Sequence, residues 1–305
     1  MNFGAGILLS LLVALTLAYV ARWYWIERRR RVPGRTRLPD LGALAIGCVT
    51  NFFDTLGIGS FAPTAAIFRL QRRVADEQIP GTLNVGHALP TIVQALIFIA
   101  VVSVNVVTLV GMIAAAVLGA WLGSAAMARL STRAIRLGMG GALLVAAALL
   151  LAKNLDWMPG GGAALGLTGV RLALALAVNF LLGALMMLGV GLYAPCLILV
   201  SLLGMDPRAA FPIMMGACAF LMPVGGARFV ANGRYHLRSA LGLALGGIPG
   251  VLLAAYVVRE LSVVALRWLV LAVVLYTALQ MLLAARRDRA PNAAAAVAPE
   301  TDSPA

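Results

Sequence analysis

The chain alternates long apolar runs with short polar stretches, a pattern typical of proteins that cross a membrane several times. A helix needs about 20 apolar residues to cross the hydrocarbon layer. Uninterrupted runs of about this length cover residues 3–21, 80–104, 106–128, 137–153, 210–230, 239–258 and 267–284. We therefore predict an all-α polytopic membrane protein.

Two further apolar segments, 41–71 and 172–204, are each broken near the middle by glycines and a proline. The breaks read GIGSFAP at 57–63 and GVGLYAP at 189–195, the same motif 132 residues apart. Pro80 and Pro212 keep this spacing. Chance similarity between apolar sequences is the alternative, but composition alone rarely matches prolines and an aromatic residue. We predict two homologous halves.

The basic residues predict how these halves lie in the membrane. If each broken segment is a re-entrant hairpin, three spanning helices separate the hairpins and the second half is inverted. With the loop 22–37 inside, 19 of the 24 Lys and Arg residues lie on the cytoplasmic side, whereas broken segments that crossed would give 15 inside and 9 outside. The positive-inside rule favours the hairpins. The N-terminus is then periplasmic and the C-terminus cytoplasmic.

The predicted organisation has five parts. An N-terminal transmembrane helix and a basic cytoplasmic loop (1–40) precede repeat 1 (41–155), a periplasmic linker (156–170) and repeat 2 (171–285). The Ala- and Pro-rich tail (286–305) is predicted to be disordered and cytoplasmic.

Composition narrows the function. Hydrophobic residues make up 62% of the chain and charged residues 11%, and the net charge is +13. The basic residues lie between apolar runs, so they indicate topology and not a nucleic-acid partner. Three cysteines in apolar runs, two histidines, and no HExxH or CxxC pattern indicate neither a metal site nor a hydrolytic enzyme. Without a Walker motif the chain does not use ATP, and we expect no cofactor.

The two breaks are the predicted substrate site. A break at membrane depth is tolerated only where it is buried in protein or lines a cavity. If Pro63 and Pro195 begin the second half-helices, the free N–H groups around them favour a small anion. Close helix packing is the alternative role of these glycines and prolines. The predicted substrate-binding residues are Gly57, Gly59, Ser60, Phe61, Ala62, Thr64, Asn84, His87, Gly189, Gly191, Leu192, Tyr193 and Ala194.

Asp54 and His87 are the candidates for proton coupling, because ionisable residues inside a membrane are costly. A carboxylate would repel an anion, so Asp54 is useful there only if it is protonated during transport or paired with a cation. Its alternative role is that of a structural partner or helix cap. His87 is either a proton relay or anion donor, or a hydrogen-bonded packing residue. Met186 and Leu192 stand where repeat 1 has Asp54 and Ser60, so the chemistry is predicted to be asymmetric.

The repeated motif, with DTLGIGSFAPT at 54–64 and IPGTLNVGH at 79–87, resembles the TauE/SafE family of sulfite exporters and related anion permeases. The similarity covers about 41–285. Ser60-Phe61 and Leu192-Tyr193 replace part of the glycine run common in the family. The resemblance implies a bacterial inner-membrane protein with duplicated halves that transports sulfite, an organosulfonate or another small sulfur-containing anion.

We expect a secondary transporter that works by alternating access, driven by the membrane potential or a proton gradient, and not an enzyme. The alternatives are a non-transporting scaffold or assembly protein, and an anion channel of the same fold. The expected partners are a small anionic substrate and the lipid bilayer, and a homodimer is one arrangement open to the protein.

Overall fold

The computed structural model describes residues 3–30, 38–57, 59–75, 78–127, 162–187 and 191–259, together with isolated positions from 137 to 155 and from 268 to 286. The predicted spans at 137–153 and 267–284 therefore lie largely outside the described residues. The tail beyond 286 and Gly189 lie outside them altogether.

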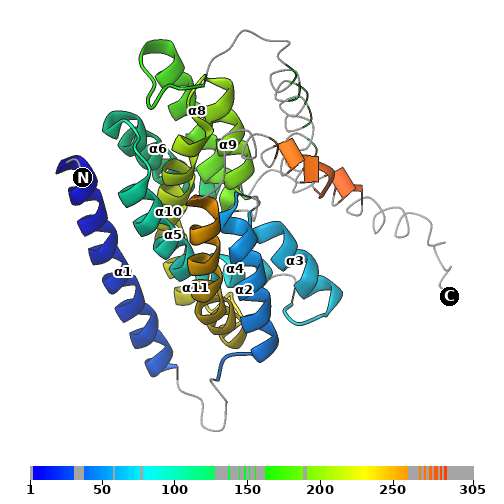
Figure 1. Cartoon of the computed structure of the whole chain (residues 1–305). Coiled ribbons are helices and arrows are strands. Elements are labelled where there is room, and N and C mark those ends of the chain that lie inside the picture. Colours follow the sequence, from blue (N-terminus) through cyan, green and yellow to red (C-terminus); the bar gives the residue numbers. More distant parts are fainter. Residues whose placement is uncertain are drawn as a thin grey trace, which may run out of the picture.

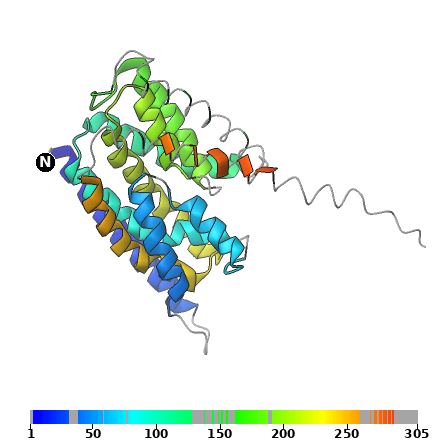
Figure 2. The same cartoon turned by 45° about the vertical axis from the view of Figure 1, so that its right-hand side comes forward.

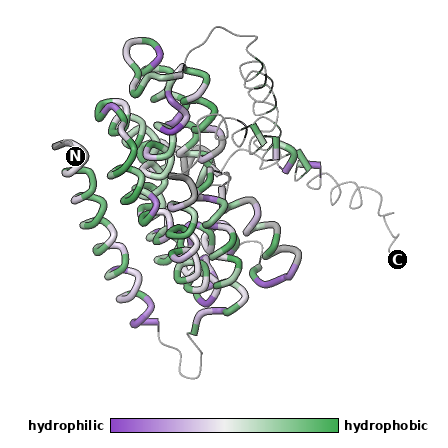
Figure 3. Tube along the Cα trace, in the orientation of Figure 1, coloured by the Kyte–Doolittle hydropathy of each residue, from purple (hydrophilic) through white to green (hydrophobic). Residues whose placement is uncertain are grey.

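In these ranges the chain forms helices and no strand, apart from one isolated bridge between Ala164 and Met205. The helices are α1 (Phe3–Arg29), α2 (Leu41–Thr55), α3 (Phe61–Leu70), α4 (Ile79–Gly86), α5 (Ala88–Val101), α6 (Val106–Met127), α8 (Gly169–Met186), α9 (Tyr193–Leu202), the short 3₁₀ helix η2 (Pro207–Ala209), α10 (Ala210–Asn232) and α11 (Leu237–Arg259). Five helical stretches among the described residues are long and apolar enough to cross a membrane. This confirms the predicted all-α membrane fold. Figure 3 shows hydrophilic residues at helix ends, as at the end of α1 and after α3.

Helix α1 is longer than predicted and ends at Arg29 instead of residue 21, because aromatic residues continue it without a breaker. Its end is fixed to the turn between α10 and α11. The Trp23 indole donates to the Tyr235 hydroxyl at 2.9 Å, and that hydroxyl donates to Glu27 at 2.6 Å. Burial and the bond to Glu27 raise the pKa of Tyr235 above its usual value. Arg30 donates to the carbonyl of Val230 near the end of α10.

Each broken segment folds back to the end of the bundle at which it starts. Asp40, just before α2, forms an ion pair at 2.8 Å with Arg73, just after α3. In repeat 2 the N–H of Asp206, after α9, donates to the carbonyl of Ala164, before α8, at 2.9 Å. Figures 1 and 2 show the α2–α3 pair and the α8–α9 pair at opposite ends of the molecule. The two helix pairs are therefore hairpins that enter the bundle from opposite ends.

The equivalent central helices of the two repeats run antiparallel. Phe98 of α5 stacks on Phe211 at the start of α10, with ring centroids 5.3 Å apart. Toward the other end, the N–H of His236, which follows α10, donates at 2.9 Å to the hydroxyl of Thr82 on α4, which precedes α5. Repeats whose equivalent helices run in opposite directions have the inverted relation that the sequence predicts.

The repeats are interlocked by glycine-mediated packing. The most extensive helix contacts join α2 to α11 and α6 to α8, so the first helix of each repeat packs on the other repeat. Every fourth residue of α11 from 242 to 250 is a glycine, and a Cβ on any of them would overlap the backbone of α2. Likewise a Cβ on Gly183 of α8 would overlap the Ala116 carbonyl of α6. Only glycine allows these backbones to approach so closely.

One predicted span, 80–104, is divided into α4 and α5 at His87. Pro90 lacks the N–H that would bond to the Gly86 carbonyl, and its ring crowds that carbonyl, so the helix bends there. His87 adopts φ −87° and ψ −6° at the bend, and its side chain is buried.

Candidate functional site

The tips of the two hairpins meet at one buried cavity, which has room for about one water molecule. Its lining residues come from both breaks and from α5 and α10: Asp54, Gly59, Ser60, Phe61, Thr91, Met186, Gly191, Leu192, Tyr193, Cys218 and Met222. Eight of these form four equivalent pairs, each 132 residues apart: 54 with 186, 59 with 191, 60 with 192, and 61 with 193. The pseudosymmetry of the sequence therefore converges on this cavity.

The first break owes its shape to two glycines. Gly57 and Gly59 have φ values of +93° and +86°, which residues with a side chain rarely adopt. The chain turns through them from α2 into α3. Helices α3 and α9 begin at Phe61 and Tyr193, so the motif prolines are third in their helices and not first as predicted. In this first turn an N–H has no partner inside the helix, so proline is tolerated there.

Asp54 connects the two sides of the first break. The side chain, only 3% exposed, projects from the last turn of α2. One carboxylate oxygen, Oδ1, accepts the backbone N–H of Ser60 at 2.5 Å, at the N-terminus of α3. The other oxygen, Oδ2, accepts the side-chain amide of Gln94 at 3.0 Å. The N–H of Ser60, predicted to face an anion, thus holds the protein's own carboxylate.

Gln94 links this carboxylate to repeat 2. Its Nε2 also donates to the Thr55 hydroxyl at 2.9 Å, and its Oε1 accepts the hydroxyl of Tyr193 at 2.5 Å. Asp54, Gln94 and Tyr193 therefore form one hydrogen-bonded chain from the first break to the start of α9. Gln94 is fully buried but is missing from the predicted site residues. The helical spacing of polar residues at 87, 91 and 94 was the signal that could have found it.

His87 does not line the cavity but lies next to Phe61, which does. Its Nδ1 is 3.0–3.1 Å from the side-chain amide of Asn51 on α2, and its Nε2 is 3.1 Å from the Thr64 hydroxyl on α3. The ring centroid of Phe61, which lines the cavity, is 5.9 Å from that of His87. His87 thus joins the two arms of the first hairpin, with both ring nitrogens hydrogen-bonded.

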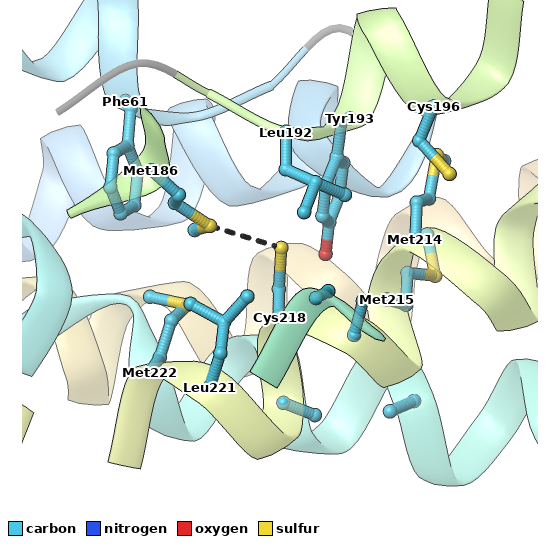
Figure 4. Close-up of a cluster of buried hydrophobic side chains, with 14 of the residues drawn as sticks. Phe61, Met186, Leu192, Tyr193, Cys196, Met214, Met215, Cys218, Leu221 and Met222 are labelled. Atoms are coloured by element: carbon cyan, nitrogen blue, oxygen red, sulfur yellow. Dashed lines mark hydrogen bonds between the residues drawn. The ribbon is translucent and has the colours of Figure 1, made fainter. Parts of the chain in front are cut away.

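Part of the cavity lining consists of sulfur-containing side chains, Met186, Cys218 and Met222. Figure 4 shows the Cys218 thiol of α10 directed at the Met186 thioether, 3.4 Å away, with Met222 on the same helix as Cys218. Phe61, Leu192 and Tyr193 cover this group from the hairpin tips. The cavity lining thus combines polar groups around Asp54 with apolar, polarisable sulfur-containing side chains.

The remaining predicted residues lie around this site. Gly57 is buried, close to side chains of α9 and α10. Asn84 lies apart from the cavity lining; its amide nitrogen donates to the Pro80 carbonyl, and its Oδ1 has no hydrogen-bond partner among the described residues. The backbones of Ala62 and Ala194 lie in the first turns of α3 and α9.

Two broken hairpins of the same sequence motif, placed tip to tip in oppositely directed repeats around one buried cavity, are the architecture of a membrane transporter built from inverted repeats. Comparison with protein families matches residues 3–150 and 171–303 to the family "Sulfite exporter TauE/SafE". The chain therefore belongs to the TauE/SafE family of membrane transporters of sulfur-containing anions, which is not a family of enzymes. Comparisons with curated proteins and with solved structures gave no match.

Proposed function

We propose that the protein is a secondary transporter that moves sulfite, an organosulfonate or a related sulfur-containing anion across the bacterial inner membrane by alternating access. The observation that carries this proposal is a cavity lined by four equivalent pairs of residues from the two repeats. A substrate held there touches both repeats at once, so a movement of one repeat against the other changes the side from which the substrate is reached.

The anion preference rests on two helix N-termini. Helices α3 and α9 both begin at the cavity, and each N-terminus stabilises an anion by up to about 2 kcal/mol in a buried setting. Hydroxyl groups of Ser60, Thr91 and Tyr193 add donors that can reorient toward substrate oxygens. The polarisable wall of Met186 and Cys218 suits the apolar part of an organosulfonate.

The cavity size supports a moving mechanism. Sulfite is larger than the one water molecule that the cavity can hold, so the hairpin tips must part to admit it. Both breaks come from one chain, so in this proposal one chain is the transport unit, and a homodimer stays a prediction. Asp54 and His87 remain the candidates for proton coupling.

We orient the molecule with the end that carries Arg30, Arg73 and Arg234 in the cytoplasm. These residues lie at the ends of α1, α3 and α10, whereas Arg171 and Arg208 lie near the entry of the second hairpin. The positive-inside rule supports this orientation. The N-terminus is then periplasmic.

Counterflow of radiolabelled sulfite into proteoliposomes that hold unlabelled sulfite tests the proposal. A carrier accumulates label transiently against its gradient, and methanesulfonate but not chloride should compete. Flux without counterflow would indicate the channel alternative. No flux above that of empty liposomes, with folded protein incorporated, would favour the scaffold alternative.

A further inference from the structure

The carboxylate of Asp54 already occupies one of the two places where the proposed function puts the substrate. Its Oδ1 lies 2.5 Å from the N–H of Ser60, immediately before α3, and Asp54 itself lines the cavity. A helix N-terminus holds a carboxylate for the same electrostatic reason that it holds a free oxyanion. The first break thus contains an anion supplied by the chain.

The hydrogen bonds around Asp54 fit its ionised form. The Ser60 N–H can only donate. Because the Tyr193 hydroxyl donates to Gln94 Oε1, the amide group of Gln94 faces Asp54 with its N–H. Both carboxylate oxygens therefore accept, and an ionised carboxylate is an acceptor only. A proton on Asp54 would add a third hydrogen to a group whose two oxygens each already face a donor, and it would weaken the hydroxyl oxygen as an acceptor.

A substrate anion does not fit beside this charge. The other titratable groups of the cavity are the Tyr193 phenol from α9 and the Cys218 thiol from α10, while Cys196 of α9 and His87 lie outside the lining. No Lys or Arg is among the lining residues in the described part of the chain. Two like charges about 4 Å apart near a protein surface would weaken binding on the order of 1,000-fold.

We propose that Asp54 is a tethered competitor of the substrate, which holds the N-terminus of α3 when ionised and yields it to the substrate anion when protonated. This inference rests on the proposed function. A proton from the aqueous side from which the substrate enters binds the carboxylate, the Ser60 N–H passes to a substrate oxygen, and both steps reverse on release. With a monoanion such as hydrogen sulfite or an organosulfonate, the first break therefore keeps one negative charge in the loaded and in the empty transporter.

Gln94 transmits the protonation of Asp54 to the second hairpin through its hydrogen bonds. A protonated Asp54 can donate to Gln94 Oε1 only after the amide rotates, and the rotated amide then presents its N–H to the Tyr193 oxygen. The direction of the hydrogen bond at the start of α9 is thereby reversed. Protonation in repeat 1 and the state of the tip of repeat 2 are coupled through one side chain.

The test compares the sulfite KM for counterflow from pH 6 to pH 9 in the wild type and in Asp54→Asn. The ionisation of sulfite affects both proteins equally and cancels in the ratio of their KM values. We expect the KM of the wild type divided by the KM of Asp54→Asn to approach one at the acidic end. Above the pH at which Asp54 titrates, this ratio should rise by up to about tenfold per pH unit. A ratio independent of pH would overturn the proposal.

The matched control is Asp206→Asn. Asp206 caps η2 by accepting the Arg208 N–H, far from the cavity lining, and asparagine caps equally well. Its KM should follow that of the wild type at every pH. A folded Asp54→Asn protein without counterflow would also overturn the proposal, since removal of a competitor leaves the site available. Wild-type protein without counterflow would instead refute the proposed function.

A second variant keeps the test decisive if Asp54→Asn does not fold. Gln94→Leu removes one donor that favours the carboxylate, so Asp54 is displaced more readily. We expect the rise of KM with pH to begin at least half a pH unit higher than in the wild type. A rise at the wild-type pH, or at lower pH, would show that the substrate does not compete with this carboxylate.

Discussion

Alanine substitution at Gly59 and at Gly191 should separate backbone strain from loss of space in the cavity. The two glycines are equivalent in the repeats, both line the cavity, and a Cβ added to either meets no atom of the described residues within 4 Å. Only Gly59, at +86°, has a φ in the region that L residues rarely adopt. An alanine side chain should therefore strain the backbone at position 59 and not at position 191.

The magnitudes follow from the backbone. An L side chain in a left-handed conformation costs about 1–2 kcal/mol. Alanine also restricts the unfolded chain, which stabilises the protein by about 0.4–1 kcal/mol where the native backbone is compatible. Gly191→Ala should then be neutral or slightly stabilising, and Gly59→Ala should be about 1–2 kcal/mol less stable than Gly191→Ala. For a chain of 305 residues that difference separates the unfolding midpoints by about 2–3 °C.

The assay is thermal unfolding in detergent at one fixed heating rate, since unfolding of such proteins is often irreversible. Gly59→Asn serves as a third variant, because asparagine enters the left-handed region more readily than alanine. Its midpoint should exceed that of Gly59→Ala although its side chain is larger. Equal midpoints for the two alanine variants, or Gly59→Asn below Gly59→Ala, would refute the reasoning. In transport, both alanine variants should raise the sulfite KM, since each adds a methyl group to a small cavity.

Gly246→Ala should yield aggregated protein in gel filtration, because the new Cβ overlaps the Leu44 carbonyl. In the control Gly111→Ala the new Cβ meets only a flexible leucine side chain, so this protein should remain monodisperse. A monodisperse Gly246→Ala protein would contradict the close packing of α11 on α2. Tyr235→Phe leaves the Trp23 indole N–H without its acceptor and should cost about 1–3 kcal/mol, seen as a lower unfolding midpoint; an unchanged midpoint would argue against this anchor of α1. In a cysteine-free background, a cysteine at position 234 should be labelled only from the cytoplasm and one at 171 only from the periplasm. The reverse pattern would invert our orientation.

The helices and the repeat could be predicted from the sequence because both follow from local signals. Apolar length fixed the spans, and the glycines at 57 and 59 marked a break that the structure realises with two positive φ values. The break at His87 was not predicted, because 80–104 was interpreted as one span although Pro90 removes the N–H that would bond to the Gly86 carbonyl. The end of α1 was misplaced by eight residues because the helix continues through the polar and aromatic residues that follow the apolar run.

The contents of the cavity were less predictable, because they depend on how the repeats interlock. The spacing of the α11 glycines indicates a close helix contact, but it does not identify α2 as the partner. Gln94 meets both Asp54 and Tyr193 only because the hairpin tips from opposite ends converge on α5. The sequence places Asn84 and Gln94 in one span, but the structure divides this span into α4, which carries Asn84, and α5, which carries Gln94, and Asn84 stays outside the lining.

The structure also explains why a symmetric framework can carry asymmetric chemistry. Inversion supplies each geometric element twice, including the broken helix, the glycine in the cavity and the helix N-terminus. The carboxylate is supplied only by repeat 1 at these positions, since repeat 2 has Met186 at the position equivalent to Asp54 and Leu192 at the position equivalent to Ser60. If both tips carried a carboxylate, two like charges would face each other across a cavity the size of one water molecule. With one carboxylate, our proposal lets either of two anions occupy the tip of repeat 1 and leaves the N-terminus of α9 to the substrate alone.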